Sequence, residues 1–199
     1  NELYMNNGQG YFSKEGRSRG LYDIDGHTRG AVALDVNRDG WLDIFAVNEG
    51  DENEMYINDG TGNFDLERRG AEGAVENSQI GTGGVTIADI DNDGDVDIYI
   101  AKQNKANELY INDSGYFTEA ALERGVDLSA MSQGATFADF DRDGDMDLFV
   151  TVTGQSENQK LYVFENDGTG YYADHTNESD IFANGYTSRL MDIDNDGDF

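Results

Sequence analysis

A nine-residue aspartate-rich segment occurs three times in this 199-residue chain, and a fourth copy begins shortly before its end. The complete copies are Asp35–Asp43, Asp89–Asp97 and Asp139–Asp147, and the fourth starts at Asp192. Oxygen-bearing side chains stand at positions 1, 3, 5 and 9 of each complete copy, and glycine stands at position 6. Glycine permits the sharp turn that lets these side chains converge on one point. The spacing therefore predicts a loop that holds a cation.

The side chains of this loop are of the kind that calcium prefers. Calcium takes several oxygen ligands in flexible geometry, whereas magnesium needs a smaller octahedral shell and transition metals favour imidazole or thiolate. The chain has no cysteine, and its two histidines, His27 and His175, lie outside the loops. Position 7 is expected to offer its backbone carbonyl oxygen. We therefore predict Ca²⁺ ligands at Asp35, Asn37, Asp39, Trp41, Asp43, Asp89, Asp91, Asp93, Asp95, Asp97, Asp139, Asp141, Asp143, Asp145, Asp147, Asp192, Asp194, Asp196 and Asp198.

Two other interpretations of the loop have to be weighed. An EF-hand begins in the same way but needs a glutamate at position 12, where this chain has Ala46, Ile100 and Val150. Plain Asp-Gly turns on an acidic surface are the second, but clustered carboxylates repel strongly without a cation. The first loop carries Asn37 and Trp41 where the others carry aspartate, so we expect it to bind more weakly. The fourth loop stops before position 9.

The acidic loops belong to a repeat of about fifty residues, since their first aspartates are 54, 50 and 53 residues apart. Short apolar segments precede each loop, and β-branched and aromatic runs follow it, which is typical of strands. The preceding segments are Ala31–Leu34, Val85–Ala88 and Ala135–Ala138, and the following runs are Asp43–Val47, Asp97–Ala101 and Asp147–Thr151. A Tyr-containing strand then meets an Asn-Asp-Gly or similar turn, a strong hairpin signal. Fourth strands are expected from Phe12, Phe64, Phe117 and Tyr172, and Arg-Gly pairs recur at Arg19, Arg69 and Arg124.

Four short strands in about fifty residues are typical of a propeller blade. A four-stranded unit cannot bury both faces alone, so blades must stack. The predicted fold is all-β, a β-propeller of four-stranded blades with calcium loops. We expect a partial blade at 1–28, blades at 29–80, 81–130 and 131–185, and the start of a further blade at 186–199. A β-solenoid and a string of small domains are the alternatives, and residues 118–123 fit either a strand or a helical turn.

The composition excludes several classes of protein. The formal net charge is −28, which argues against nucleic-acid binding because phosphate contacts need clustered lysine and arginine. An acidic chain can be disordered, but 11% of the residues are aromatic and the acids recur at fixed positions. No apolar run approaches the ~20 residues needed to cross a bilayer. The chain is therefore expected to be folded, without a transmembrane segment, and to bind cations.

The acidic loops with their following Asp-Ile-Phe or Asp-Leu-Phe strands resemble FG-GAP/VCBS repeats, the blades of integrin α-subunit-like β-propellers. The Asn-Glu-Leu-Tyr and Asn-Asp-Gly-Thr-Gly-Asn-Phe segments are similar to those of secreted propellers related to ASPIC and cartilage acidic protein. The resemblance covers nearly the whole chain. It implies a propeller, usually seven-bladed, with calcium in the loops between first and second strands, and an extracellular or cell-surface location. Seven blades need about 350 residues, so we expect a fragment of a longer protein; a closed four-blade ring is the alternative.

Three functions are compatible with these features. A recognition or adhesion module that binds a protein or glycan is the first. A structural subunit of an extracellular assembly, built with other copies, is the second, and a polysaccharide-active enzyme is the third. The sequence has no cysteine nucleophile, no nucleophile elbow and no phosphate loop, so we expect no enzyme. Glycosylation sequons stand at Asn112 and Asn177.

Overall fold

The computed structural model describes residues 2–22, 27–73, 81–153, 160–177 and 186, and these residues are mostly β-structure. The first four-stranded sheet contains β3 (Thr28–Leu34), β4 (Asp43–Asn48), β5 (Glu54–Asn58) and β6 (Phe64–Glu67). The second contains β7 (Thr82–Ala88), β8 (Asp97–Ala106), β9 (Glu108–Asp113) and β10 (Tyr116–Glu119). The third set is β11 (Ser129–Ala138), β12 (Asp147–Val152), β13 (Lys160–Asn166) and β14 (Tyr172–Asp174). A separate hairpin joins β1 (Tyr4–Asn6) to β2 (Phe12–Lys14).

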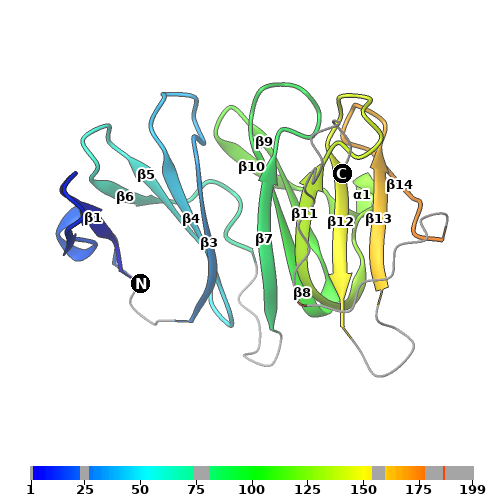
Figure 1. Ribbon diagram of the computed structural model, residues 1–199, viewed down its shortest axis with the longest axis horizontal. Coiled ribbons are helices and arrows are strands. Elements are labelled where there is room, and N and C mark those ends of the chain that lie inside the picture. Colours follow the sequence, from blue (N-terminus) through cyan, green and yellow to red (C-terminus); the bar gives the residue numbers. More distant parts are fainter. Residues whose placement is uncertain (1, 23–26, 74–80, 154–159, 178–185, 187–199) are drawn as a thin grey trace.

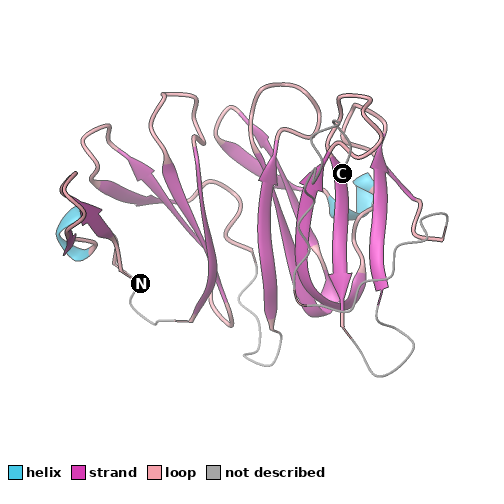
Figure 2. Ribbon diagram, in the orientation of Figure 1, coloured by secondary structure: helices cyan, strands magenta, loops and turns pink. Residues whose placement is uncertain are grey.

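Each set of four strands is an antiparallel meander in which sequence neighbours pair. The second and third sets are also hydrogen-bonded to each other, because Ser129 and Ala130 of β11 pair with Ala106 and Lys105 of β8. In the described part of the chain, the short helical turns are η1 (Arg17–Arg19) and α1 (Ala121–Arg124) (Figure 2). Such consecutive meanders are the building plan of propeller blades.

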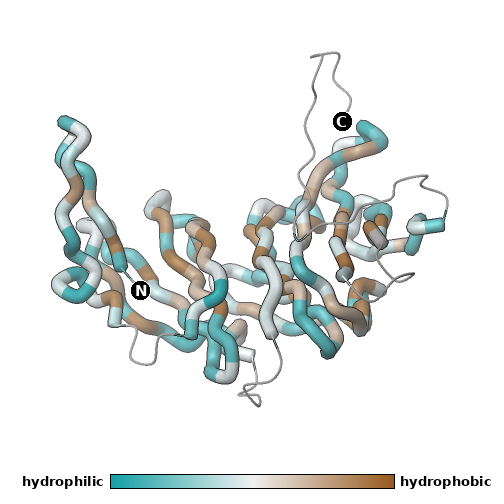
Figure 3. Tube along the Cα trace, turned by 60° about the horizontal axis from the view of Figure 1, so that its bottom comes forward, coloured by the Kyte–Doolittle hydropathy of each residue, from teal (hydrophilic) through white to brown (hydrophobic). Residues whose placement is uncertain are grey.

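The sheets stand side by side in a row that curves, as the turned view shows (Figure 3). In Figure 1 the loops β3–β4, β7–β8 and β11–β12 all lie at the upper edge of this row. The two views together confirm the predicted all-β fold and match part of a β-propeller; the number of blades stays a prediction. The three acidic loops therefore share one edge of the molecule.

The apolar core lies between neighbouring sheets. Ile98 and Ile100 of β8 face the first sheet, where they belong to a cluster with Phe45 and Val47. Tyr99 of the same strand faces the third set and packs in a second cluster. Alternate residues of one strand thus fill two different interfaces, which explains why β8 is apolar at every position from Ile98 to Ala101.

The Arg-Gly pairs form part of these interfaces. The N–H of Phe117 in β10 donates to the carbonyl oxygen of Arg69 at 2.7 Å. A Cβ atom on Gly70 would lie 2.2 Å from the Phe117 carbonyl oxygen, and Gly70 has a φ of +97°. The Arg69 guanidinium lies 5.0 Å from the centre of the Tyr116 ring. Only glycine allows this approach of one sheet's connecting segment to the next sheet.

The predicted strand positions agree with the structure. The apolar segments before the acidic loops end β3, β7 and β11, and the runs after them begin β4, β8 and β12. Residues 118–123 are divided between the end of β10 and the start of α1. Among the described residues, no helix has the length and apolar character needed to cross a membrane.

Candidate metal centre

Each acidic loop connects the first and second strands of its sheet, and its backbone turns left-handed twice. Position 6 is glycine in all three loops, with φ of +87° at Gly40, +88° at Gly94 and +100° at Gly144. Position 4 is also left-handed, with φ of 57° at Arg38 and 59° at Asn92. The glycine turn was predicted from sequence, whereas the turn at position 4 was not. These two turns curl the chain so that its first, third and ninth residues approach one another.

The aspartate at position 9 closes the loop from a buried place at the start of the second strand. Asp97 is 1% exposed; its Oδ2 accepts a hydrogen bond from the Ile90 N–H at 3.0 Å and its Oδ1 accepts one from the Asn112 N–H at 2.8 Å. The same two bonds recur in the other loops. Val36 and Asn58 donate to Asp43, and Phe140 and Asn166 donate to Asp147.

Burial makes these closing carboxylates costly to ionise without a counter-ion. Burial raises the pKa of Asp97 to about 7, against the lowering effect of its two backbone hydrogen bonds. Burial likewise raises the pKa of Asp147 to about 6 and raises that of Asp43. The carboxylates at positions 3 and 5 raise the pKa of Asp97 further. A cation at this point would stabilise the ionised form of the whole group.

Two of the loops bring carboxylate oxygens together. Ligand atoms of Asp89, Asp91 and Asp97 lie within 4.8 Å of one another, and so do those of Asp139, Asp141 and Asp147. The Oδ1 atoms of Asp89, Asp91 and Asp139 are buried and receive no hydrogen bond within the described part of the chain. A buried carboxylate oxygen without a donor is expensive. All the converging atoms are oxygens, so the donor set fits Ca²⁺.

Other predicted ligands are not part of these triads. The position-5 carboxylates accept the N–H of position 7 instead: Asp39 from Trp41 at 2.8 Å, Asp93 from Asp95 at 2.7 Å, and Asp143 from Asp145 at 2.9 Å. The first loop has Asn37 at position 3, and the Asp39 N–H donates to both Asp35 and Asn37. The ligands predicted at Asp192, Asp194, Asp196 and Asp198 lie outside the described residues. Position 12 lies on buried strand residues, Ala46, Ile100 and Val150, as expected for a loop that is not an EF-hand.

The sequence reading missed the asparagines that support the loops. Asn112 is 1% exposed, and its Nδ2 donates to the carbonyl oxygens of Val96 in its own sheet and Val36 in the preceding one. Asn166 makes the equivalent bonds to Met146 and Ile90. By itself, the repeated Asn-Asp-Gly signal predicts only a turn. The signal recurs at Asn58, Asn112 and Asn166, 15 to 19 residues after the position-9 aspartate of each acidic loop, and this constant order could have shown a link between the two.

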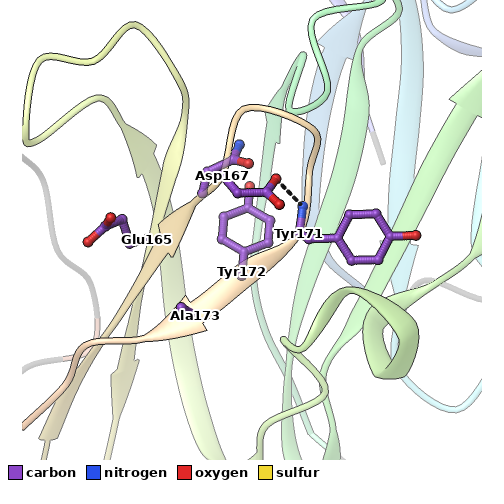
Figure 4. Close-up of a pocket in the computed structure, with 6 residues that line it drawn as sticks. Glu165, Asp167, Tyr171, Tyr172 and Ala173 are labelled. Carbon is purple, nitrogen blue, oxygen red and sulfur yellow. Dashed lines mark hydrogen bonds between the residues drawn. The ribbon is translucent and has the colours of Figure 1, made fainter.

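The remaining candidate groups lie away from the loops. The Nδ1 atom of His27 is 3.1 Å from Asp51 Oδ2, and that of His175 is 3.4 Å from Glu165 Oε2. Figure 4 shows a pocket of about 210 Å³ beside β13 and β14. Its Asp167 carboxylate already accepts hydrogen bonds from Thr169, and the Tyr171 ring points away from the pocket. Glu165 also lines the pocket, so both of its carboxylates already have partners among the described residues: Asp167 has Thr169 and Glu165 has His175.

Comparisons with known proteins agree with this architecture. The FG-GAP-like repeat family matches residues 35–100 and 89–150, which together contain all three complete acidic loops. No curated protein sequence matched the chain. Among solved structures, a lectin from Agrocybe aegerita, described for specific recognition of non-reducing terminal N-acetylglucosamine, is similar with a TM-score of 0.55 and 21% identity. The match covers 89% of this chain and 46% of the lectin, so the chain spans about half of the lectin's length.

Proposed function

Because this chain belongs to the FG-GAP-like repeat family, we propose that its acidic loops are calcium sites that rigidify an extracellular β-propeller used for recognition or adhesion. One observation carries this proposal: carboxylate oxygens of Asp89, Asp91 and Asp97 lie within 4.8 Å of one another, and the buried Oδ1 atoms of Asp89 and Asp91 receive no hydrogen bond from the described residues. Surface Asp-Gly turns would instead point these oxygens into water. A divalent cation satisfies all of them at once.

The choice of calcium rests on the ligands and on their support. Carboxylate and carbonyl oxygens in a curled loop suit the larger, flexible shell of calcium better than the strict octahedron of magnesium. The position-9 aspartates are held by backbone N–H groups, so one side of the shell is fixed before the ion binds. The ions would also reduce a net charge of −28, which otherwise opposes the compact state.

The position of the loops suggests what calcium does for the molecule. Each loop joins two strands of one sheet, and in the first two loops the position-2 carbonyl accepts a hydrogen bond from the next sheet: Val36 from Asn112, and Ile90 from Asn166. An ion that fixes the loop thereby fixes the contact between neighbouring sheets. The surface near these loops would then be rigid enough to bind a protein or a glycan. The lectin is similar to this chain in fold only, so its sugar is no guide to this chain's ligand.

Calcium titration of the purified chain tests the proposal. Isothermal titration calorimetry, with bound metal counted by elemental analysis, should give at least two calcium ions per chain at millimolar calcium. Magnesium at the same concentration should not displace them. The variant Asp89→Asn keeps the size and the Gly94 hydrogen bond of the first ligand but removes its charge, and it should lose one ion. An unchanged metal count in this variant, or no calcium uptake by the parent chain, would reject the proposal.

A further inference from the structure

In the first two acidic loops, the residue at position 4 reaches the acidic loop of the next sheet. Its backbone is left-handed, with φ of 57° at Arg38 and 59° at Asn92. In the first loop, the Nη2 atom of Arg38 donates to the carbonyl oxygen of Asp93 at 2.6 Å, and its Nε donates to that of Gly94 at 3.1 Å. Both acceptors lie in the second loop, 55 and 56 residues away in sequence.

The same guanidinium also approaches two carboxylates of the second loop. Arg38 Nε lies 2.6 Å from Asp95 Oδ1, and Nη2 lies 3.5 Å from Asp93 Oδ1. Nε has a single hydrogen, which points to Gly94, so the approach to Asp95 is a charge–charge contact. Asp95 is 4% exposed. A second arginine, Arg124, stands farther off, with Nη2 at 3.9 Å from Asp91 Oδ2.

The second and third loops repeat this geometry with different chemistry. Position 4 of the second loop is Asn92, whose Nδ2 donates to Asp145 Oδ1 of the third loop at 2.7 Å. Asp145 occupies position 7, the position that Asp95 occupies in the second loop. Both loops carry five aspartates. The second loop therefore receives a full positive charge from its neighbour, whereas the third receives a neutral amide.

We propose that the residue at position 4 of the first and second acidic loops sets the calcium affinity of the loop in the next sheet. Arg38 weakens calcium binding in Asp89–Asp97 because its positive charge lies beside Asp93 and Asp95, neutralises part of their negative charge and repels the ion. Asn92 brings a neutral amide to the third loop instead. The inference rests on the proposed calcium function and adds to it a residue outside the ligand set that tunes each site. Since Arg38 is half exposed, solvent screens the effect, and we expect a change of about two- to tenfold in Kd.

A reciprocal swap tests this proposal. Arg38→Asn places in the first loop the residue that the second loop already has, at a φ that asparagine tolerates. It should tighten one calcium site by about two- to tenfold at low ionic strength. Asn92→Arg should weaken one site by a similar factor. Both differences should shrink in ~0.5 M KCl, because salt screens exposed charges.

Site assignment comes from variants that disable one loop. On an Asp89→Asn background, Arg38→Asn should no longer change calcium binding. On an Asp139→Asn background, Asn92→Arg should likewise leave calcium binding unchanged. Arg38→Lys, which keeps the charge, should bind calcium like the parent chain. The melting temperature in chelator gives a second readout: Arg38→Asn should lower it, because the ion-free second loop loses its counter-charge. A purely structural role would lower stability without tightening calcium binding.

The outcomes separate this proposal from the calcium function itself. Calcium uptake by the parent chain with no change, or with weaker binding, in Arg38→Asn would overturn the role of position 4 and leave the calcium sites standing. A salt-independent change would also overturn it. Absence of calcium uptake by the parent chain would reject both.

Discussion

The Asp97 carboxylate and the Asn112 backbone N–H are joined by a hydrogen bond of 2.8 Å, which ties an acidic loop to the hairpin of the same sheet. The Asn112 side chain continues the connection to Val36 in the preceding sheet at 3.1 Å. Asp97 therefore has two tasks: it closes the proposed ion site, and it supports the fold even without an ion. The predicted ligands at other positions of the loop support the ion-free fold less than Asp97 does.

This division of labour predicts different effects of two substitutions in one loop. Asp97→Asn replaces one acceptor oxygen with an NH₂ group, so either the Ile90 or the Asn112 N–H loses its acceptor in a buried place. We expect a loss of about 1–3 kcal/mol in the free energy of unfolding, even in chelator. Asp93→Ala should cost clearly less in chelator, because Asp93 is exposed and accepts one local bond. Urea unfolding of both variants in EDTA makes the comparison, and equal losses would contradict the supporting role of Asp97.

The geometry of the acidic loops can be predicted from the sequence because it is local. Positions 1, 3 and 9, with glycine at position 6, converge within nine residues, and the structure brings Asp89, Asp91 and Asp97 together. The contacts of Asn112 with Val36 and of Arg38 with Gly94 could not be predicted from the sequence, because they join residues 76 and 56 positions apart. Such contacts depend on how sheets stack. The short helix α1 also involves such a contact, because it ends at Gly125 in a left-handed turn, where an added Cβ would lie 2.9 Å from the Tyr172 carbonyl oxygen.

Calcium should raise the thermal stability of the chain. At ~1 mM calcium and a Kd of ~0.1 mM, each site stabilises the native state by about 1.4 kcal/mol, and three sites by about 4 kcal/mol. For a chain of this length, that corresponds to a rise of about 8–16 °C in the melting temperature. Circular dichroism melts in calcium and in EDTA measure it. Asp89→Asn should lose part of the response, whereas Asp65→Ala, on the exposed face of β6, should keep all of it. A melting temperature indifferent to calcium and chelator would mean that the loops are turns without ions.

The Arg-Gly pair offers a test of how tightly the sheets pack. Gly70→Ala adds a Cβ atom 2.2 Å from the Phe117 carbonyl oxygen at a φ of +97°, so β10 must shift. That shift would also stretch the hydrogen bond from Phe117 to Arg69. We expect a loss of at least ~2 kcal/mol in the free energy of unfolding.

Gly8→Ala is the matched control for this substitution. Gly8 has a φ of +81° but no atom within 4 Å of an added Cβ, so it reports the backbone strain alone. That strain should cost about 1 kcal/mol. Unfolding by urea in saturating calcium compares the two variants. Similar losses would show that the segment after β6 adapts easily and that the Arg-Gly pair does not fix the spacing of the sheets.

The first loop should bind calcium more weakly than the other two, and the chain contains a reporter for it. Trp41 is the only tryptophan and occupies position 7 of that loop. The backbone N–H of Trp41 donates to the Asp39 carboxylate at 2.8 Å. Its indole nitrogen lies against Gly60, 2.9 Å from the position that a Cβ atom on Gly60 would take. An ion bound to the Trp41 carbonyl would move this backbone and change the emission of the indole.

The first loop has three aspartates against five in the second, so its tryptophan signal should reach half-saturation at several-fold higher calcium than the tightest site found by calorimetry. Asn37→Asp should shift that midpoint to lower calcium, whereas Asp141→Asn, in the third loop, should leave it in place while removing an ion from the total. A tryptophan midpoint at or below that of the tightest site would contradict the link between carboxylate number and affinity in these loops.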